Sequence, residues 1–329
     1  MTSPVTPTLN DASAVDPVRG RGGGRSNKKS APSSIMDRER RKLLIPLVGP
    51  AFVFYTVLFI IPSLAAIWIS FHKWAGAGPM EFVGFKNYVR IAGDELFRHS
   101  FVNTLKLLFV VGIIIFVVAF ALTLVLRDMW GKGAVRSIIF FPHLVNALVY
   151  GALAGFIFNP NGLVNKILEV FGIDAPPAWL ATDNIFMLIM ATLVLTMTGY
   201  YTTILMAGVD RIPPSLFEDC ALAGANAWQR LRYVILPLTW DVFGTCAVLW
   251  TITSVKIFEV VWLFGGAATE GGPPIQTWTV AVYTFVTAFG GTSIPAYGMA
   301  SAASIISLLL VLVLVVLLRR LMRREALEF

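Results

Sequence analysis

Charged residues are scarce in this chain. Only 14% of its 329 residues are Asp, Glu, Lys or Arg, whereas 57% are apolar. A soluble domain carries about 25% charged residues, so most of this chain is predicted to lie in lipid rather than in water. Its two cysteines, Cys220 and Cys246, have no CxxC spacing and cannot build a disulfide framework.

Motifs of enzymes and metal sites are also missing. The three histidines, His72, His99 and His143, are scattered and match no metal-ligand spacing. The stretch GKGAVRS at 131–137 has Leu126 where a phosphate-binding loop needs its first glycine. No HExxH, GxSxG or paired-carboxylate motif occurs. We therefore expect no catalytic site, no metal site and no cofactor in this chain.

Long apolar runs dominate what is present. A bilayer core of about 30 Å needs about 20 helical residues, and six runs satisfy this: roughly 43–71, 102–126, 137–158, 185–208, 238–264 and 296–318. The sequence predicts an all-α polytopic membrane protein with a six-span domain over 37–329. Residues 1–36 are rich in Ser, Pro and Gly, and are predicted to be a disordered tail because they cannot bury enough apolar surface.

The basic residues predict the orientation of these spans. With the N-terminus in the cytoplasm, nineteen of the 26 Lys and Arg residues fall in the tail, the inner loops and the C-terminal end, and five fall in outer loops. Positive residues favour the cytoplasmic side, so both termini and the loop 209–237 are expected there. The net charge of +7 then reflects topology and does not indicate nucleic-acid binding.

The loop 209–237 is much longer than a turn between two spans requires, and its sequence predicts two helices. Ser215 and Glu218 have the spacing of a capping box at the start of the first. Gly224 is expected to end that helix, since glycine tolerates the left-handed conformation. Asn226 and Gln229 repeat the capping spacing for the second helix.

The second helix is expected to carry Trp228, Leu231 and Ile235 on one face, and Leu236-Pro237 is expected to break it and begin the fifth span. Three functions fit such a loop. It could be an amphipathic helix lying on the bilayer, or a DNA-binding helix-turn-helix, which its acidic first helix and membrane tether disfavour. The third is a docking element for a groove of a cytosolic partner.

Lys256 and Glu259 are the clearest charges inside a predicted span. Their spacing places them on one helix face, where they can neutralise each other. They could line a translocation path, but a structural ion pair near the outer end is favoured. No mid-membrane carboxylate or pair of broken helices, the features of secondary transporters, is evident. The chain is therefore expected to be a conduit whose energy comes from a partner.

The loop also resembles a known family, the permease subunits of bacterial ABC importers. Their coupling loop reads EAA, three residues, Gly, nine residues and I-x-Leu-Pro. This sequence aligns with that pattern at Glu218, at Ala221 to Gly224, at Val234 and at Leu236-Pro237. It departs at Asp219 and Cys220, where the family usually has two alanines, and at Ala223, where many sugar permeases have Asp.

Three further stretches resemble the carbohydrate branch of that family, which includes the maltose and glycerol-phosphate permeases. They are FVGFKNYVRI at 82–91, FNPNGLVNKIL at 158–168 and SVKIFEVVWLFGGAATEGGP at 254–273. Lys256 and Glu259 lie within the last, which supports a structural role for them. The resemblance covers residues from about 40 to 325.

The resemblance implies a multi-pass permease of the cell membrane with the type I importer fold, which would form half of a sugar pore. It implies a second, homologous permease, two cytosolic ATPases that bind ATP, and an extracellular or periplasmic solute-binding protein. Membrane lipid would surround the chain, and no nucleic acid would bind. The residues implied at the ATPase-docking surface are Ser215, Glu218, Asp219, Ala221, Ala223, Gly224, Leu236 and Pro237. The alternatives are a stand-alone channel or secondary transporter, or a scaffold subunit.

Overall fold

The structure is a computed structural model that describes residues 46–127, 129–173, 177–268, 272–290 and 294–322. The predicted tail over 1–36 therefore lies outside the described residues. The first described helix is Pro46–Ser70, and it contains a π-helical segment at Thr56–Ile60 and the α-helix α2 at Ile61–Ser70.

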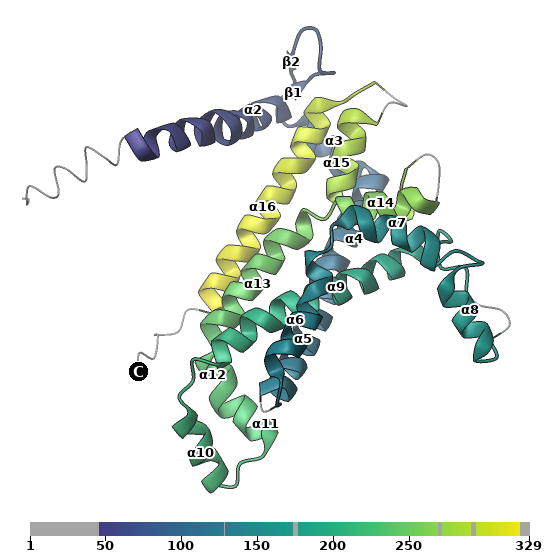
Figure 1. Cartoon of the computed structure of the whole chain (residues 1–329). Helices are drawn as coiled ribbons and strands as arrows, with labels where there is room; N and C mark the ends of the chain where they lie inside the picture. The colour runs from purple at the N-terminus through teal and green to yellow at the C-terminus, as the bar shows by residue number, and fades with distance from the viewer. Residues whose placement is uncertain (1–45, 128, 174–176, 269–271, 291–293, 323–329) are drawn as a thin grey trace, which may run out of the picture. The chain divides into compact units, whose positions relative to one another are not determined.

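The described elements that follow are almost all helical (Figure 1). In chain order they are β1 (His72–Lys73), β2 (Glu81–Phe82), α3 (Lys86–Gly93), α4 (Glu95–Lys106), a π-segment (Leu107–Val111), α5 (Gly112–Arg127), α6 (Lys132–Leu144), α7 (Ala147–Ile157), α8 (Leu163–Val170), α9 (Ile185–Val209), α10 (Pro214–Leu222), α11 (Ala227–Arg230), a π-segment (Leu231–Ile235), α12 (Leu236–Leu238), α13 (Trp240–Val255), α14 (Glu259–Ala268), a 3₁₀ turn (Ile275–Thr277), α15 (Val280–Phe289) and α16 (Tyr297–Met322).

Four of the described helices are long and apolar enough to cross a membrane without interruption: Pro46–Ser70, Glu95–Arg127, Ile185–Val209 and Tyr297–Met322. They correspond to the predicted first, second, fourth and sixth spans. The second is longer than predicted, because α4 joins it through the π-segment.

The predicted third span, 137–158, is wrong as a single helix. It is divided between α6 and α7, which meet at an angle of 89°. The break follows Pro142, whose ring removes a backbone donor from α6. Asn146 then starts α7, and its side-chain Oδ1 accepts a hydrogen bond from the backbone N–H of Leu148 at 2.9 Å.

The predicted fifth span, 238–264, is also not continuous. α13 ends at Val255, residues 256–258 are not helical, and α14 begins at Glu259. A 74° bend separates Trp228–Leu238 from α13. The third and fifth predicted spans are therefore each interrupted, although the sequence showed no evident pair of broken helices.

The main core lies where α5, α9 and α13 meet, and α9 also packs on α6. Leu107, Ile115, Ile189 and Leu205 are among its fully buried side chains. Trp250 of α13 donates its indole N–H to the backbone carbonyl of Leu108 at 2.8 Å. This bond fixes α13 against the helix that contains α5.

Helices α6 and α9 touch through their backbones. A side-chain carbon at Gly199 of α9 would collide with the backbone carbonyl of Ile139 in α6. Only glycine fits there, because the backbones of the two helices are in direct contact at this residue.

A second cluster joins α15 and α16 to α3 and α4 through Ile91, Phe97, Tyr283 and Ala303. Asp94 links these elements, because its Oδ1 accepts from the backbone N–H of Leu96 at 2.9 Å and its Oδ2 accepts from the Tyr283 hydroxyl at 2.7 Å. The motif FVGFKNYVRI lies here, and Asn87 within it donates to the backbone carbonyls of Ser70 and His72.

Candidate functional site: the loop between α9 and α13

The first helix of the loop, α10, begins at Pro214, with Pro213 before it. No side chain caps its start, and Ser215 lies inside the first turn. The predicted capping box of Ser215 and Glu218 is therefore wrong. The physical reason is Pro214: its fixed φ suits the first helical position and its missing N–H needs no cap, so the helix begins before Ser215.

The glycine corner is confirmed. Gly224 has φ of +68°, its N–H donates to the carbonyl of Ala221 at 3.1 Å, and the N–H of Ala225 donates to the carbonyl of Cys220 at 2.9 Å. These two bonds form a Schellman motif, which satisfies the last carbonyls of α10. An added Cβ at Gly224 would meet no atom, so the backbone conformation, and not lack of room, requires glycine.

The second predicted cap is also confirmed. The N–H of Asn226 donates to Oε1 of Gln229 at 2.8 Å, and the N–H of Gln229 donates to Oδ1 of Asn226 at 2.9 Å. This reciprocal pair is a capping box. Because this cap lies two residues after Gly224, the helix Trp228–Leu238 begins soon after α10 ends, which gives the sharp corner seen between α10 and α11 in Figure 1.

The end of the second helix differs from the prediction. Leu236 and Pro237 remain helical, and the 74° bend falls after Leu238. Thr239 lies at the bend, is 1% exposed, and donates its hydroxyl to the carbonyl of Ile235 at 2.7 Å. Pro237 lacks an N–H for the preceding turn, and a π-helical segment lies just before it.

One small cluster holds the loop to the rest of the molecule. Phe217 of α10, Ile235, and Val209 and Ile212 at the end of α9 are buried together. The guanidinium of Arg127, at the end of α5, lies 3.2 Å from the centroid of the Phe217 ring. Leu231 and Ile235 are in the cluster as expected, but Trp228 is 66% exposed and does not share their face.

The rest of α10 and its corner face outward. The exposed residues are Ser215, Glu218, Asp219, Ala221, Leu222, Ala223 and Gly224, while Leu236 and Pro237 are half-buried. Leu222 is 88% exposed, and in the part of the chain that the structure describes neither Glu218 nor Asp219 has a salt bridge. The helix thus presents an apolar tip beside two free carboxylates.

Three residues of this arrangement were missed by sequence reasoning. Leu222 lies between the aligned alanines, and a large apolar side chain two residues before the glycine could have indicated an exposed contact. Phe217 and Arg127 are ninety positions apart, and no local signal relates them.

Lys256 and Glu259 do not form the expected pair. Lys256 follows the end of α13 and Glu259 begins α14, so the helical spacing that would align them is absent. Both are exposed, and no salt bridge joins them. They are separate charges on either side of a break.

Hydrogen bonds from neutral side chains hold the backbone at the break and in the segment before α15. The hydroxyl of Thr279 donates to the carbonyl of Ile257 at 2.9 Å. The amide of Asn103, in α4, donates to the carbonyls of Gln276 at 2.8 Å and Trp278 at 3.1 Å. Thr104 accepts from the N–H of Val280 at 3.0 Å. The polar residues of α4 therefore fix the chain between α14 and α15.

Sequence comparison finds relatives along most of the chain, although no protein-family model matches it. A probable ABC transporter permease protein of Pyrococcus horikoshii is 30% identical over 275 residues, which cover 78% of this chain and 92% of that protein. The trehalose/maltose transport system permease protein MalF of Thermococcus litoralis is 29% identical over 272 residues, with 82% and 88% covered. The alpha-glucoside transport system permease protein AglF of Rhizobium meliloti is 28% identical over 277 residues, with 80% and 77% covered.

Solved structures show the same fold. A chain of a bacterial ABC transporter for import of the acidic polysaccharide alginate superposes with a TM-score of 0.74 at 22% identity, covering 88% of this chain and 98% of that one. A chain of the alginate transporter in complex with an alginate pentasaccharide-bound periplasmic protein gives the same TM-score at 21% identity, covering 89% and 98%.

The relatives are permease components of transport systems, so this chain is a transport component and not an enzyme. Its long apolar helices make it a multi-pass membrane protein. The stand-alone channel or secondary transporter is not favoured. The chain belongs to the ABC transporter permease family, as the resemblance of its loop predicted.

Proposed function

We propose that this chain forms half of the translocation pathway of an ATP-driven importer for a sugar or oligosaccharide. The substrate class rests on the relatives, which are named as transport proteins for trehalose and maltose, for alpha-glucosides and for lactose. The fold match to an alginate importer agrees with a saccharide substrate.

The ATPase partner docks on α10 and its corner. Leu222 supplies an apolar contact that is 88% exposed, and Glu218 and Asp219 supply a charged rim around it. An apolar face with a polar rim is the usual form of a helix that seats in a groove of a partner. Two cytosolic ATPases, one for this chain and one for a second, homologous permease, complete the transporter.

The opposite side of the membrane receives the sugar from a solute-binding protein. A similar chain has been seen in a complex with a sugar-bound periplasmic protein, which supports such a partner here. The excess of basic residues in the loop and the C-terminal end supports a cytoplasmic location for both termini and for α10.

Charge reversal on α10 tests the docking. Glu218→Lys in the assembled transporter should abolish co-purification of the ATPase, because it replaces a free carboxylate at the contact by the opposite charge. Uptake of labelled trehalose, maltose and lactose into vesicles should be lost with it. Glu169→Lys, an equally exposed reversal on α8, is the matched control and should leave both unchanged.

Two outcomes would count against the proposal. If Glu218→Lys and Leu222→Asp together leave ATPase co-purification intact, α10 is not the docking element. If the wild-type transporter imports no saccharide of the panel, while it imports an amino acid or peptide, the substrate class is wrong.

A further inference from the structure

Arg127 is the last residue of α5, and its side chain lies on the inner face of α10. Its guanidinium carbon is 3.2 Å from the centroid of the Phe217 ring, and Phe217 is only 8% exposed. Leu124, about one turn earlier in α5, packs against the same buried cluster. The end of α5 therefore holds α10 from the inside, although the two helices are far apart in the chain.

The two faces of α10 contact different parts of the transporter. Phe217 is buried in the cluster, whereas the next residue, Glu218, is exposed on the face that is proposed to receive the ATPase. Leu222 is exposed on that outer face as well. A force applied to the outer face therefore reaches the rest of the chain in two ways, through the backbone at the ends of α10 and through Phe217.

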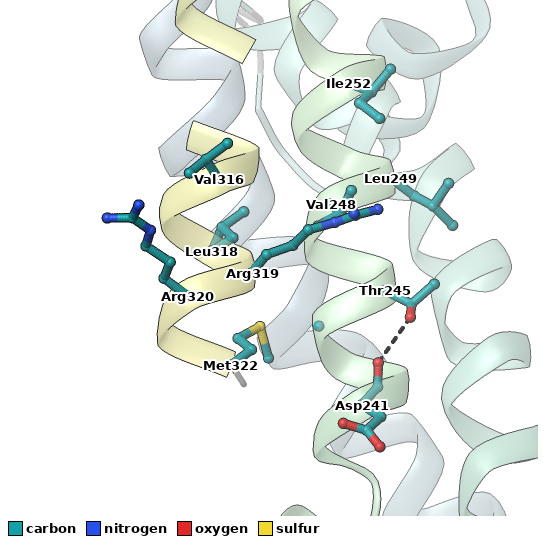
Figure 2. A pocket seen from close by; sticks show the side chains of 11 residues that line it. Asp241, Thr245, Val248, Leu249, Ile252, Val316, Leu318, Arg319, Arg320 and Met322 are labelled. Carbon is teal, nitrogen blue, oxygen red and sulfur yellow. Dashed lines mark hydrogen bonds between the residues drawn. The ribbon is translucent and has the colours of Figure 1, made fainter. Parts of the chain in front are cut away.

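Arginines at the end of another long apolar helix show that a seat on a ring is not a general property of such residues. Arg319 and Arg320 lie in the last turn of α16 and border a groove between α13 and α16 (Figure 2). Arg320 is exposed and points away from α13. Within the described residues, neither arginine has a salt bridge or lies over an aromatic ring. The helix dipole and the cytoplasmic preference of positive residues therefore do not explain the contact of Arg127.

The turn between α5 and α6 carries two further cations, which contact α9. Lys132 Nζ lies 3.5 Å from Asp210 Oδ1, and about half of each side chain is exposed. Arg136 donates to the backbone carbonyl of Thr203 at 3.1 Å. An exposed ion pair contributes little, whereas a guanidinium stacked on a buried ring is a stronger contact. Of these three cations, Arg127 is the one that the described structure places on α10.

We propose that Arg127 is a positioning residue of the transport cycle, which acts through Phe217 and makes α5 follow α10 when the ATPase displaces it. The inference rests on the proposed docking of the ATPase on α10 and adds a path from that helix into the membrane domain. Helix α5 packs against α9 in the main core, so a displacement that reaches α5 at Arg127 moves the core helices together.

The ratio of saccharide imported to ATP hydrolysed, measured with the assembled transporter in vesicles, tests the proposal. Arg127→Gln should keep the ATPase bound, because the outer face of α10 is unaltered, and should lower this ratio about tenfold, as residues that couple two sites can do. Arg127→Lys should recover part of the loss, since an ammonium group can also lie over a ring. Arg320→Gln, the same change at the end of α16, and Lys132→Gln should leave the ratio unchanged.

A double-variant cycle shows whether Arg127 acts through Phe217. Phe217→Leu keeps a buried apolar side chain but removes the face of the ring. In that background Arg127→Gln should have little further effect on the ratio, because two residues that share one contact are not additive. Additive losses would mean that Arg127 acts elsewhere and would contradict the proposal.

Spin labels give a readout that a purely structural role would not change. One label on Cys220, a free and half-buried thiol of α10, and one at Val125→Cys, an exposed position of α5, report the distance between the two helices. Cys246 is buried and stays unlabelled. In wild type the distance should be the same before and after ATP is trapped with vanadate, because α5 follows α10. In Arg127→Gln it should change on trapping.

Three results would overturn the proposal: an unchanged transport ratio in Arg127→Gln, a label distance that changes equally in both proteins, or loss of the ATPase from Arg127→Gln. The last would show that Arg127 only keeps α10 folded. The label measurement needs no imported sugar, so it does not depend on the saccharide panel. Failure of the docking itself is detected separately, by Glu218→Lys.

Discussion

The loop between α9 and α13 and the break between α13 and α14 interrupt the helices in opposite ways. The loop satisfies its backbone from within, through Gly224 with Ala221, Ala225 with Cys220, and Asn226 with Gln229. The break depends on a donor from far along the chain, the hydroxyl of Thr279, and Asn103 of α4 in turn holds the segment that precedes Thr279. The loop is also exposed along α10, whereas Asn103, Thr104 and Thr279 are buried.

This difference separates two kinds of rigidity. A segment with local hydrogen bonds keeps its shape while its outer face stays available for a partner, because no tertiary contact is needed on that face. A segment fixed by buried distant donors cannot shift without leaving polar groups unsatisfied. We therefore expect α10 to move as a unit, and the segment 276–280, with the break that Thr279 contacts, to stay fixed to α4.

The largest effect is expected at Phe217, the buried contact between α10 and the body. Phe217→Ala leaves a cavity in the cluster and removes the ring beneath Arg127, and should lower the free energy of opening of α10 by about 3–4 kcal/mol. Hydrogen exchange should then show loss of protection over 214–222 with α9 unchanged. Equal loss in α9 would mean that the loop is not a separate unit. Leu222→Ala, at an exposed side chain, is the control.

A smaller effect is expected at the break. Asn103→Leu removes the donor to the carbonyls of Gln276 and Trp278, and should lower the free energy of unfolding by about 2–3 kcal/mol. The melting temperature of the purified chain in detergent measures it, with Arg98→Gln on the exposed side of α4 as control. A melting temperature equal to that of wild type would show that the segment 276–278, which supports the break through Thr279, needs no donor from α4.

Gly224→Ala should cost about 1 kcal/mol, because φ of +68° is unfavourable for a residue with a Cβ even in open space. Limited proteolysis near the corner should speed up, and Gly224→Asn should recover part of the resistance, since asparagine tolerates this conformation better. Identical rates in all three proteins would exclude backbone strain as the reason for glycine.

The smallest effects distinguish the two predicted caps. Asn226→Ala should destabilise the second helix by about 1 kcal/mol, because it removes an observed capping bond. Ser215→Ala should stay within about 0.5 kcal/mol, because Ser215 caps nothing. Hydrogen exchange of the two helices measures both effects. A larger destabilisation by Ser215→Ala than by Asn226→Ala would contradict the absence of a side-chain cap at the start of α10.

The capping features of the loop could be predicted from the sequence where the residues that form them are close together in the chain. Gly224, Asn226 and Gln229 act within six residues of each other, and all three behave as predicted. Ser215 failed because one neighbouring proline moved the helix start. The family was also predictable, since the loop pattern lies in a continuous stretch.

Features that join distant residues could not be predicted in this way. Hydropathy measures the length of an apolar run and not the direction of its helix, so the bend after Leu144 in the third span and the break at 256–258 in the fifth could not be predicted from it. The pairing of Lys256 with Glu259 assumed a continuous helix that does not exist there. The contact of Arg127 with Phe217 forms only once α5 and α10 are packed.

The meeting of Gly199 with the carbonyl of Ile139 has a mechanical consequence. Helices that touch backbone to backbone have no side chains between them to take up a shift, and the ring of Tyr200 stacks on His143 of α6 beside this contact. We therefore expect α6 and α9 to tilt about Gly199 rather than to slide past each other. Spectroscopic labels placed on the two sides of this residue would report distance changes of opposite sign.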